Sequence, residues 1–191
     1  MNSATLTCPC RLIPILVLAA AICAPAQSTN HTRFRGVIND FTPATSIKPG
    51  GPSEVRGDWS LVRKGEPGRD ECKADFSAAL TMERSDLGVV QNGNDLDDPM
   101  DRMAHTHHIT LKDGQVKIIP GGIQVTGEAT ITANGSFPPP FGSTLPMLTI
   151  EITGGTGENS VPFSNITVLF GAPASGHFGS NPLHGVVRSA R

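Results

Sequence analysis

The chain contains little cysteine, little aromatic character and little charge. Among its 191 residues are four Cys, one Trp and no Tyr, and 17% of the residues are charged. Three of the cysteines lie within residues 1–26, so the rest of the chain keeps only Cys72 and cannot form an intramolecular disulfide. Cys72 follows Arg-Asp-Glu and precedes Lys, which predicts an exposed turn with an incidental thiol; an intermolecular disulfide remains the alternative.

These shortages exclude several classes of function. The formal net charge is −2 and is dispersed, whereas a nucleic-acid-binding protein usually carries a basic patch, so no nucleic-acid partner is expected. The scarcity of Trp and Tyr argues against a lectin, because sugar-binding sites commonly stack rings on these side chains. There is no G-x-S-x-G sequence, so an enzyme with a serine nucleophile of the hydrolase type is not expected. Cys72 has no histidine near it in sequence, so an enzyme with a cysteine nucleophile is not expected either.

Residues 1–26 are typical of a secretory signal peptide. Arg11 is the only charged residue in this segment, the apolar run at residues 12–24 follows it, and small residues precede a cleavage site after Ala26. The apolar run is shorter than the roughly 20 residues of a membrane-spanning helix. We therefore predict a secreted or periplasmic protein with no membrane span and a single domain at residues 27–191.

The remainder of the chain alternates between apolar and polar residues, which is typical of half-buried β-strands. In residues 73–84, for example, Phe76, Leu80 and Met82 share one face. About nine strands are expected in all, at residues 33–38, 55–63, 73–84, 104–111, 115–119, 123–132, 146–153, 164–170 and 183–188.

The spacing of these strands predicts an all-β fold, either an antiparallel β-barrel or a β-sandwich. An Asp-Gly pair at Asp113 and Gly114 is the strongest short hairpin signal, and it predicts a turn between residues 104–111 and 115–119. The long segment at residues 85–103 leads into the histidine-rich strand and is the candidate for a rim or lid over a site.

The sharpest chemical feature is a group of three histidines at positions 105, 107 and 108. On a strand, His105 and His107 share a face and His108 takes the other. Two such imidazoles can hold a metal ion if further ligands come from elsewhere, and His177 and His184 are the candidates. Imidazole nitrogen suits zinc or another transition metal. The alternative is a pair of hydrogen-bonded pocket histidines without metal.

Carboxylates are the remaining candidates for this site. Glu83 is at the end of the strand at residues 73–84, and Asp86 follows it. Either carboxylate can orient a ligating imidazole if this strand is next to the histidine strand at residues 104–111. The alternative is that both face solvent. Residues 92–101 are acidic, but their spacing misses the D-x-[DN]-x-[DN]-G pattern, which argues against calcium.

Several stretches resemble those of uncharacterised secreted bacterial β-rich proteins. The stretches are residues 74–83 (ADFSAALTME), 104–111 (AHTHHITL), 177–179 (HFG) and 182–187 (PLHGVV). The resemblance covers most of the chain after the signal peptide and implies an exported β-protein. It implies no activity, ligand or site residue.

The sequence therefore favours an exported binding protein with a histidine-lined pocket that takes a metal ion or a small molecule. Three alternatives stay open. One is a secreted enzyme that uses the same histidines for metal-assisted or acid–base chemistry. The others are a barrel for a small apolar ligand and a cell-surface structural module.

Overall fold

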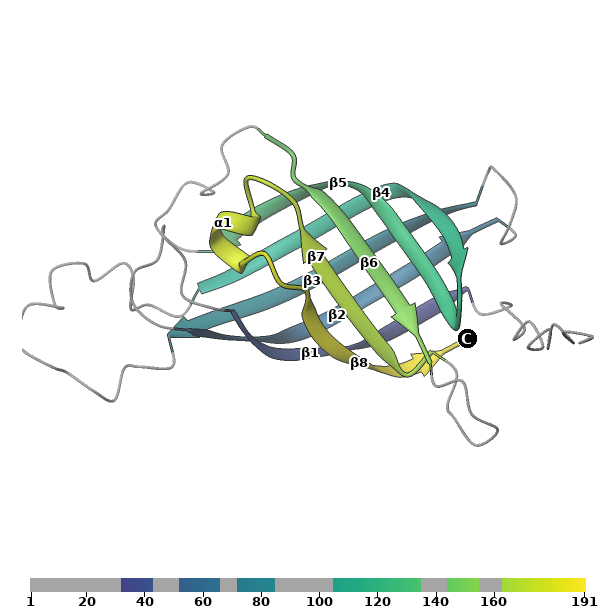
Figure 1. The fold of residues 1–191 in the computed structure, drawn as a ribbon, viewed down its shortest axis with the longest axis horizontal. Helices are drawn as coiled ribbons and strands as arrows, with labels where there is room; N and C mark the ends of the chain where they lie inside the picture. The colour runs from purple at the N-terminus through teal and green to yellow at the C-terminus, as the bar shows by residue number, and fades with distance from the viewer. Residues whose placement is uncertain (1–31, 43–51, 66–71, 85–104, 135–143, 155–162) are drawn as a thin grey trace, which may run out of the picture.

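The computed structural model describes residues 32–42, 52–65, 72–84, 105–134, 144–154 and 163–191. They form eight strands and one short helix (Figure 1). The elements in chain order are β1 (Arg33–Thr42), β2 (Ser53–Lys64), β3 (Lys73–Arg84), β4 (His105–Ile119), β5 (Gly122–Asn134), β6 (Met147–Thr153), β7 (Asn165–Phe170), α1 (Ser175–Phe178) and β8 (Leu183–Ala190). The expected signal peptide and the candidate lid at residues 85–103 lie outside the described residues.

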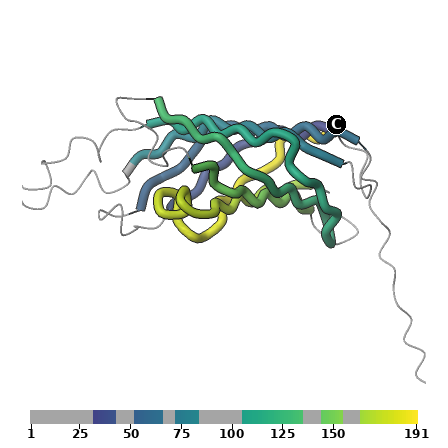
Figure 2. Tube along the Cα trace, turned by 90° about the horizontal axis from the view of Figure 1, so that it is seen from above, coloured from purple at the N-terminus to yellow at the C-terminus, as the bar shows by residue number. Residues whose placement is uncertain are grey.

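The strands form a closed antiparallel barrel in which each strand pairs with the next along the chain. Closure comes from β8, which pairs with β1 from Phe34 opposite Ala190 to Ile38 opposite Gly185. Figure 2 shows the barrel from above, with the blue strands β2 and β3 on one side and the green and yellow β6 and β7 on the other. The prediction of an all-β fold is confirmed, and the structure decides for the barrel over the sandwich.

The apolar side chains of the alternating sequence pattern fill the barrel interior. On β3, Phe76, Leu80 and Met82 are almost fully buried, while Ser77 and Ala79 between them are exposed. The other strands contribute apolar side chains in the same way, so the core is one continuous cluster that includes Trp59. Burial of this kind supplies most of the stabilisation of a small domain.

The predicted hairpin at Asp113–Gly114 is wrong, and this is why the structure has eight strands instead of about nine. The two predicted strands on either side of it are halves of β4, and both halves pair with the long strand β5. Asp113 has φ 52°, and the register of pairing shifts there, so the pair forms a bulge within the strand. An Asp-Gly pair suits both a type I′ turn and a bulge with a left-handed residue, because each of these contains a residue with positive φ. The turn itself lies at Pro120 and Gly121.

Cys72 also departs from its prediction. Its side chain is buried, at 1% exposure, instead of lying in an exposed turn. The alternation of β3 extends back past its first residue, so Cys72 points inward with Ala74 and Phe76 despite its charged neighbours in sequence. Within the described residues, no helix has the length and apolar character needed to cross a membrane.

Candidate metal centre

Strand β4 directs two histidines into one end of the barrel. His105 pairs with Met82 and His107 pairs with Leu80 on the neighbouring β3. His107 is fully buried, His105 is partly exposed and His108 between the inward residues is exposed. The prediction that His105 and His107 share the inward face, with His108 outside, is therefore confirmed.

The third histidine comes from α1, at the same end of the barrel (Figure 1). This single helical turn follows β7, and the backbone N–H groups of His177 and Phe178 both donate to the carbonyl of Ala174. Phe178 is fully buried and stacks on Phe170 with ring centroids 4.1 Å apart, which fixes the helix against the barrel. The neighbouring His177 is thereby held inside at 8% exposure.

The three imidazoles converge through their Nε2 atoms. The Nε2 atom of His177 lies 2.8 Å from that of His107 and 3.4 Å from that of His105. One candidate ligand atom from each ring lies within 4.8 Å of the others. Two nitrogens bound to one ion at about 2.0–2.1 Å lie about 2.9 Å apart at a right angle and about 3.4 Å apart at the tetrahedral angle. The 3.4 Å separation from His105 corresponds to the tetrahedral angle, and the 2.8 Å separation from His107 is close to the right-angle value.

The surroundings of the cluster are apolar and aromatic. The His107 ring packs edge-on against Phe178 at 5.0 Å and against His105 at 4.6 Å between centroids. Among the described residues, no Asp, Glu or Cys joins the three histidines as a candidate ligand. The cluster therefore offers three neutral nitrogen donors in a site that solvent reaches on the His105 side.

The structure does not bring His184 into this cluster. Leu183 at the start of β8 points inward, so His184 faces outward by alternation. Its Nδ1 lies 2.9 Å from a carboxylate oxygen of Asp40, and its backbone N–H donates to the same oxygen at 2.7 Å. Burial raises the pKa of Asp40, but these hydrogen bonds and one from the N–H of Phe41 outweigh it and leave the pKa below its usual value. The pair fastens β8 to the end of β1.

Glu83, the one of the two expected carboxylates that the structure describes, does not join the imidazoles either. Glu83 follows the inward-facing Met82, so its side chain lies outside the barrel, where a carboxylate oxygen is 3.5 Å from Arg56. Asp86 lies outside the described residues. Sequence alone could not rank His177 above His184, because the choice depends on a helical turn only four residues long.

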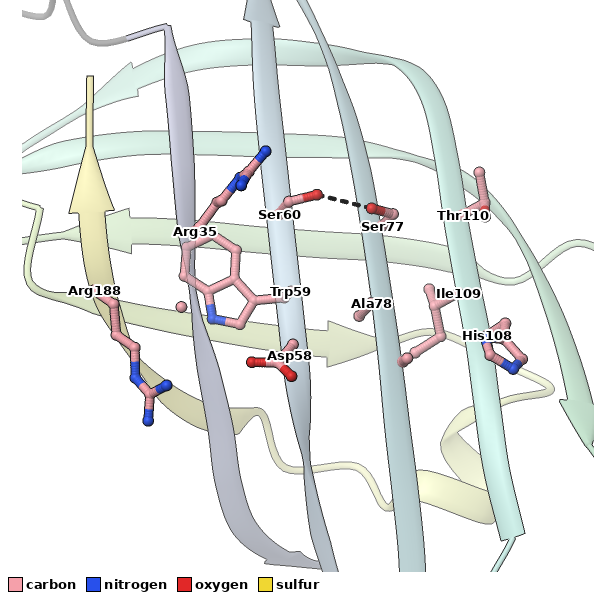
Figure 3. Close-up of a pocket in the computed structure, with 12 residues that line it drawn as sticks. Arg35, Asp58, Trp59, Ser60, Ser77, Ala78, His108, Ile109, Thr110 and Arg188 are labelled. Atoms are coloured by element: carbon pink, nitrogen blue, oxygen red, sulfur yellow. Dashed lines mark hydrogen bonds between the residues drawn. The ribbon is translucent and has the colours of Figure 1, made fainter.

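A separate hollow of about 580 Å³ lies on the outer face of the barrel, across β8, β1, β2, β3 and β4 (Figure 3). Its middle is lined by short side chains, including Ser60 and Ser77, whose hydroxyls are 2.9 Å apart. Arg35 and Arg188 line one side and His108 the other. Its polar lining residues, such as His108, alternate along the strands with inward ones, whereas the three-histidine cluster is on the inward face.

No protein-family model, curated protein or solved structure matches this chain.

Proposed function

We propose that this protein is an exported β-barrel that binds a transition-metal ion through His105, His107 and His177. The observation that carries the proposal is the convergence of three Nε2 atoms, two from β4 and one from α1, inside one end of the barrel. Neutral imidazole is a good ligand for zinc, copper, nickel and iron. Export is part of the proposal because residues 1–26 have the pattern of a secretory signal.

A metal ion explains this arrangement better than a hydrogen-bonded histidine pair does. The Nε2 atom of His177 faces the Nε2 atoms of both His107 and His105. One imidazole nitrogen carries either a proton or a lone pair, so it makes one good hydrogen bond in its ring plane. A single ion between the three rings accepts all three lone pairs at once.

A second candidate function is metal-assisted catalysis, and the partial exposure of His105 favours it. Catalytic zinc sites commonly have three protein ligands and a water in the fourth position, and such water ionises near neutral pH. In this candidate the three histidines would be the only protein ligands, and water would take the fourth position of the ion. Hydrolytic activity that appears with metal and disappears with the His107 variant described below would favour this candidate over simple binding.

The test is a titration of metal-free protein with Co(II) and Zn(II). It compares substitutions of His107 and His108, which are adjacent on β4 but face opposite sides of the barrel wall. Wild type and the His108→Gln variant should each bind one ion per chain, since His108 is outside the barrel. The His107→Gln variant should bind about 100-fold more weakly, because four-ligand structural zinc sites yield about 10–16 kcal/mol, or about 3 kcal/mol per ligand. Equal affinities for the two variants, or no binding by wild type, would refute the proposal.

A further inference from the structure

A buried methionine is the cross-strand partner of one of the three histidines. Met82 on β3 is directly opposite His105 in the β3–β4 register, and both belong to the inward face. Directly opposite residues on one face of an antiparallel pair have Cβ atoms about 4.5–5.5 Å apart. Met82 is 1% exposed, so its thioether lies within the barrel end and not in solvent. Its three flexible side-chain bonds allow the sulfur to reach an ion held by His105.

The charge of the site discriminates between metals. As metal ligands, the three imidazoles and the thioether are uncharged. Among the residues that the structure describes, no carboxylate joins the cluster. Glu83, next to Met82 in sequence, points out of the barrel and lies near Arg56. A doubly charged ion in this apolar setting keeps more uncompensated charge than a singly charged one, and buried uncompensated charge is costly.

The chemistry of the donor atoms also favours a singly charged ion. Thioether sulfur is a soft ligand that selects Cu(I), while imidazole binds both oxidation states of copper. Zinc gains little from a thioether, and its sites in proteins are built from Cys, His and carboxylate. A set of three imidazoles and one thioether is therefore matched to copper and especially to its reduced form.

We propose that the metal centre is a copper site in which Met82 is the fourth protein ligand and stabilises Cu(I). The inference rests on the proposed function, because it uses the same three histidines. It adds a residue that the histidine pattern does not contain, and it names the metal. Met82 would bind the ion from β3 while His105 and His107 bind it from β4 and His177 from α1, so the ion links three elements of the barrel end.

The experiment compares two methionine variants of the full protein. Met82→Leu removes the buried sulfur and nearly conserves volume, which costs less than about 1.5 kcal/mol of stability in a typical core. Met147→Leu is the matched control, since Met147 begins β6 and is 49% exposed. Cu(I) affinity is measured anaerobically by competition with bicinchoninate, and Zn(II) affinity by competition with a chromophoric zinc chelator.

We expect Met82→Leu to weaken Cu(I) binding by at least about tenfold, since it removes one coordinate bond, and to change Zn(II) affinity by less than about twofold. Met147→Leu should match wild type for both ions. An unchanged Cu(I) affinity, or an equal loss for both ions, would overturn the assignment of Met82 while the histidine site stands. Absence of any metal binding by wild type would instead refute the proposed function itself.

A spectroscopic measurement on wild type keeps the inference testable if Met82→Leu does not fold. X-ray absorption of the Cu(I)-loaded protein should show a sulfur scatterer in addition to imidazole nitrogens. A spectrum with nitrogen and oxygen neighbours only would overturn the role of Met82.

Discussion

Arg63 is a buried cation at the end of the barrel away from the histidines, and its replacement should stabilise the protein. Its side chain is on the inward face of β2 at 5% exposure. Neither its Nε nor its Nη1 atom has a hydrogen-bond acceptor among the described residues. Burial lowers the pKa of the guanidinium, and the nearby Cys72 opposes this, but a guanidinium stays protonated in proteins. Folding therefore removes a charged donor group from water without full compensation.

The magnitude follows from the two donors. Each buried polar group without a partner costs about 1–3 kcal/mol, so the two donor nitrogens of Arg63, Nε and Nη1, together cost about 2–6 kcal/mol. Methionine has a similar length and no hydrogen-bond donor. Its side chain is smaller than that of arginine, so the loss of packing reduces the gain in stability by about 1–2 kcal/mol. We expect the Arg63→Met variant to be more stable than wild type by about 2 kcal/mol, which raises Tm by about 4–8 °C in a domain of this size.

The assay is thermal unfolding of metal-free protein followed by circular dichroism, with urea unfolding as a second measure. Arg35→Met is the control, because Arg35 is exposed on the neighbouring β1 and its replacement should change stability by no more than about 0.5 kcal/mol. A Tm for Arg63→Met several degrees below that of wild type would refute the reasoning, since it would mean that the guanidinium is well paired in the folded state.

Three further predictions concern the barrel wall. Gly36→Ala should destabilise the protein by about 3 kcal/mol or more in urea unfolding, because the new Cβ would lie 1.9 Å from the carbonyl oxygen of Val186 at the seam that closes the barrel; wild-type stability would contradict this. Hydrogen bonds from Lys64 and from a backbone N–H lower the pKa of Asp75 to about 2 from an ordinary 3.8, so its contribution to stability is complete above pH 3.8 and is lost as the pH falls toward 2. Urea unfolding between pH 5 and pH 2 should therefore show a shallower loss of stability for Asp75→Asn than for wild type, and parallel curves would contradict the assignment. Cys72 should react with a thiol reagent only on unfolding, because it is 1% exposed and burial raises its pKa; rapid labelling of the native protein would show that it is accessible.

The fold was predictable where a side chain's environment follows from period-2 alternation. That pattern identified the inward faces of β3, β5, β6 and β7, because the inward positions on these four strands are apolar. It failed at Asp113, where the local signal for a turn is also the signal for a bulge. The outcome there depends on β5, which is long enough to pair with both halves of β4, and pairing over such a length is not visible in a short window of sequence. The burial of Cys72 escaped prediction for a related reason, since its neighbours in sequence are charged while its own side chain is 1% exposed.

The site was predictable only in the part built on a strand. Alternation places His105 and His107 together as soon as β4 is recognised, and the exposed His108 follows from the same rule. The third ligand depends on α1, a turn too short to form by its own propensity. That turn is held by Phe178, which stacks on Phe170 and contacts the His107 ring.

The same dependence bears on the proposed metal binding. Two ligands are fixed on the long strand β4, which pairs along its length with β3 and β5, and so they are preorganised. The proposed third ligand is on a four-residue helix that packs on the barrel through the Phe178–Phe170 ring stack and the Phe178–His107 ring contact. Loss of Phe178 should therefore release His177 and weaken metal binding while β4 and the barrel stay intact, since a short turn opens at lower free energy than the strands do. In Phe178→Leu we expect weaker metal binding with strand circular dichroism like that of wild type, and unchanged affinity would show that contacts other than the aromatic stack hold α1.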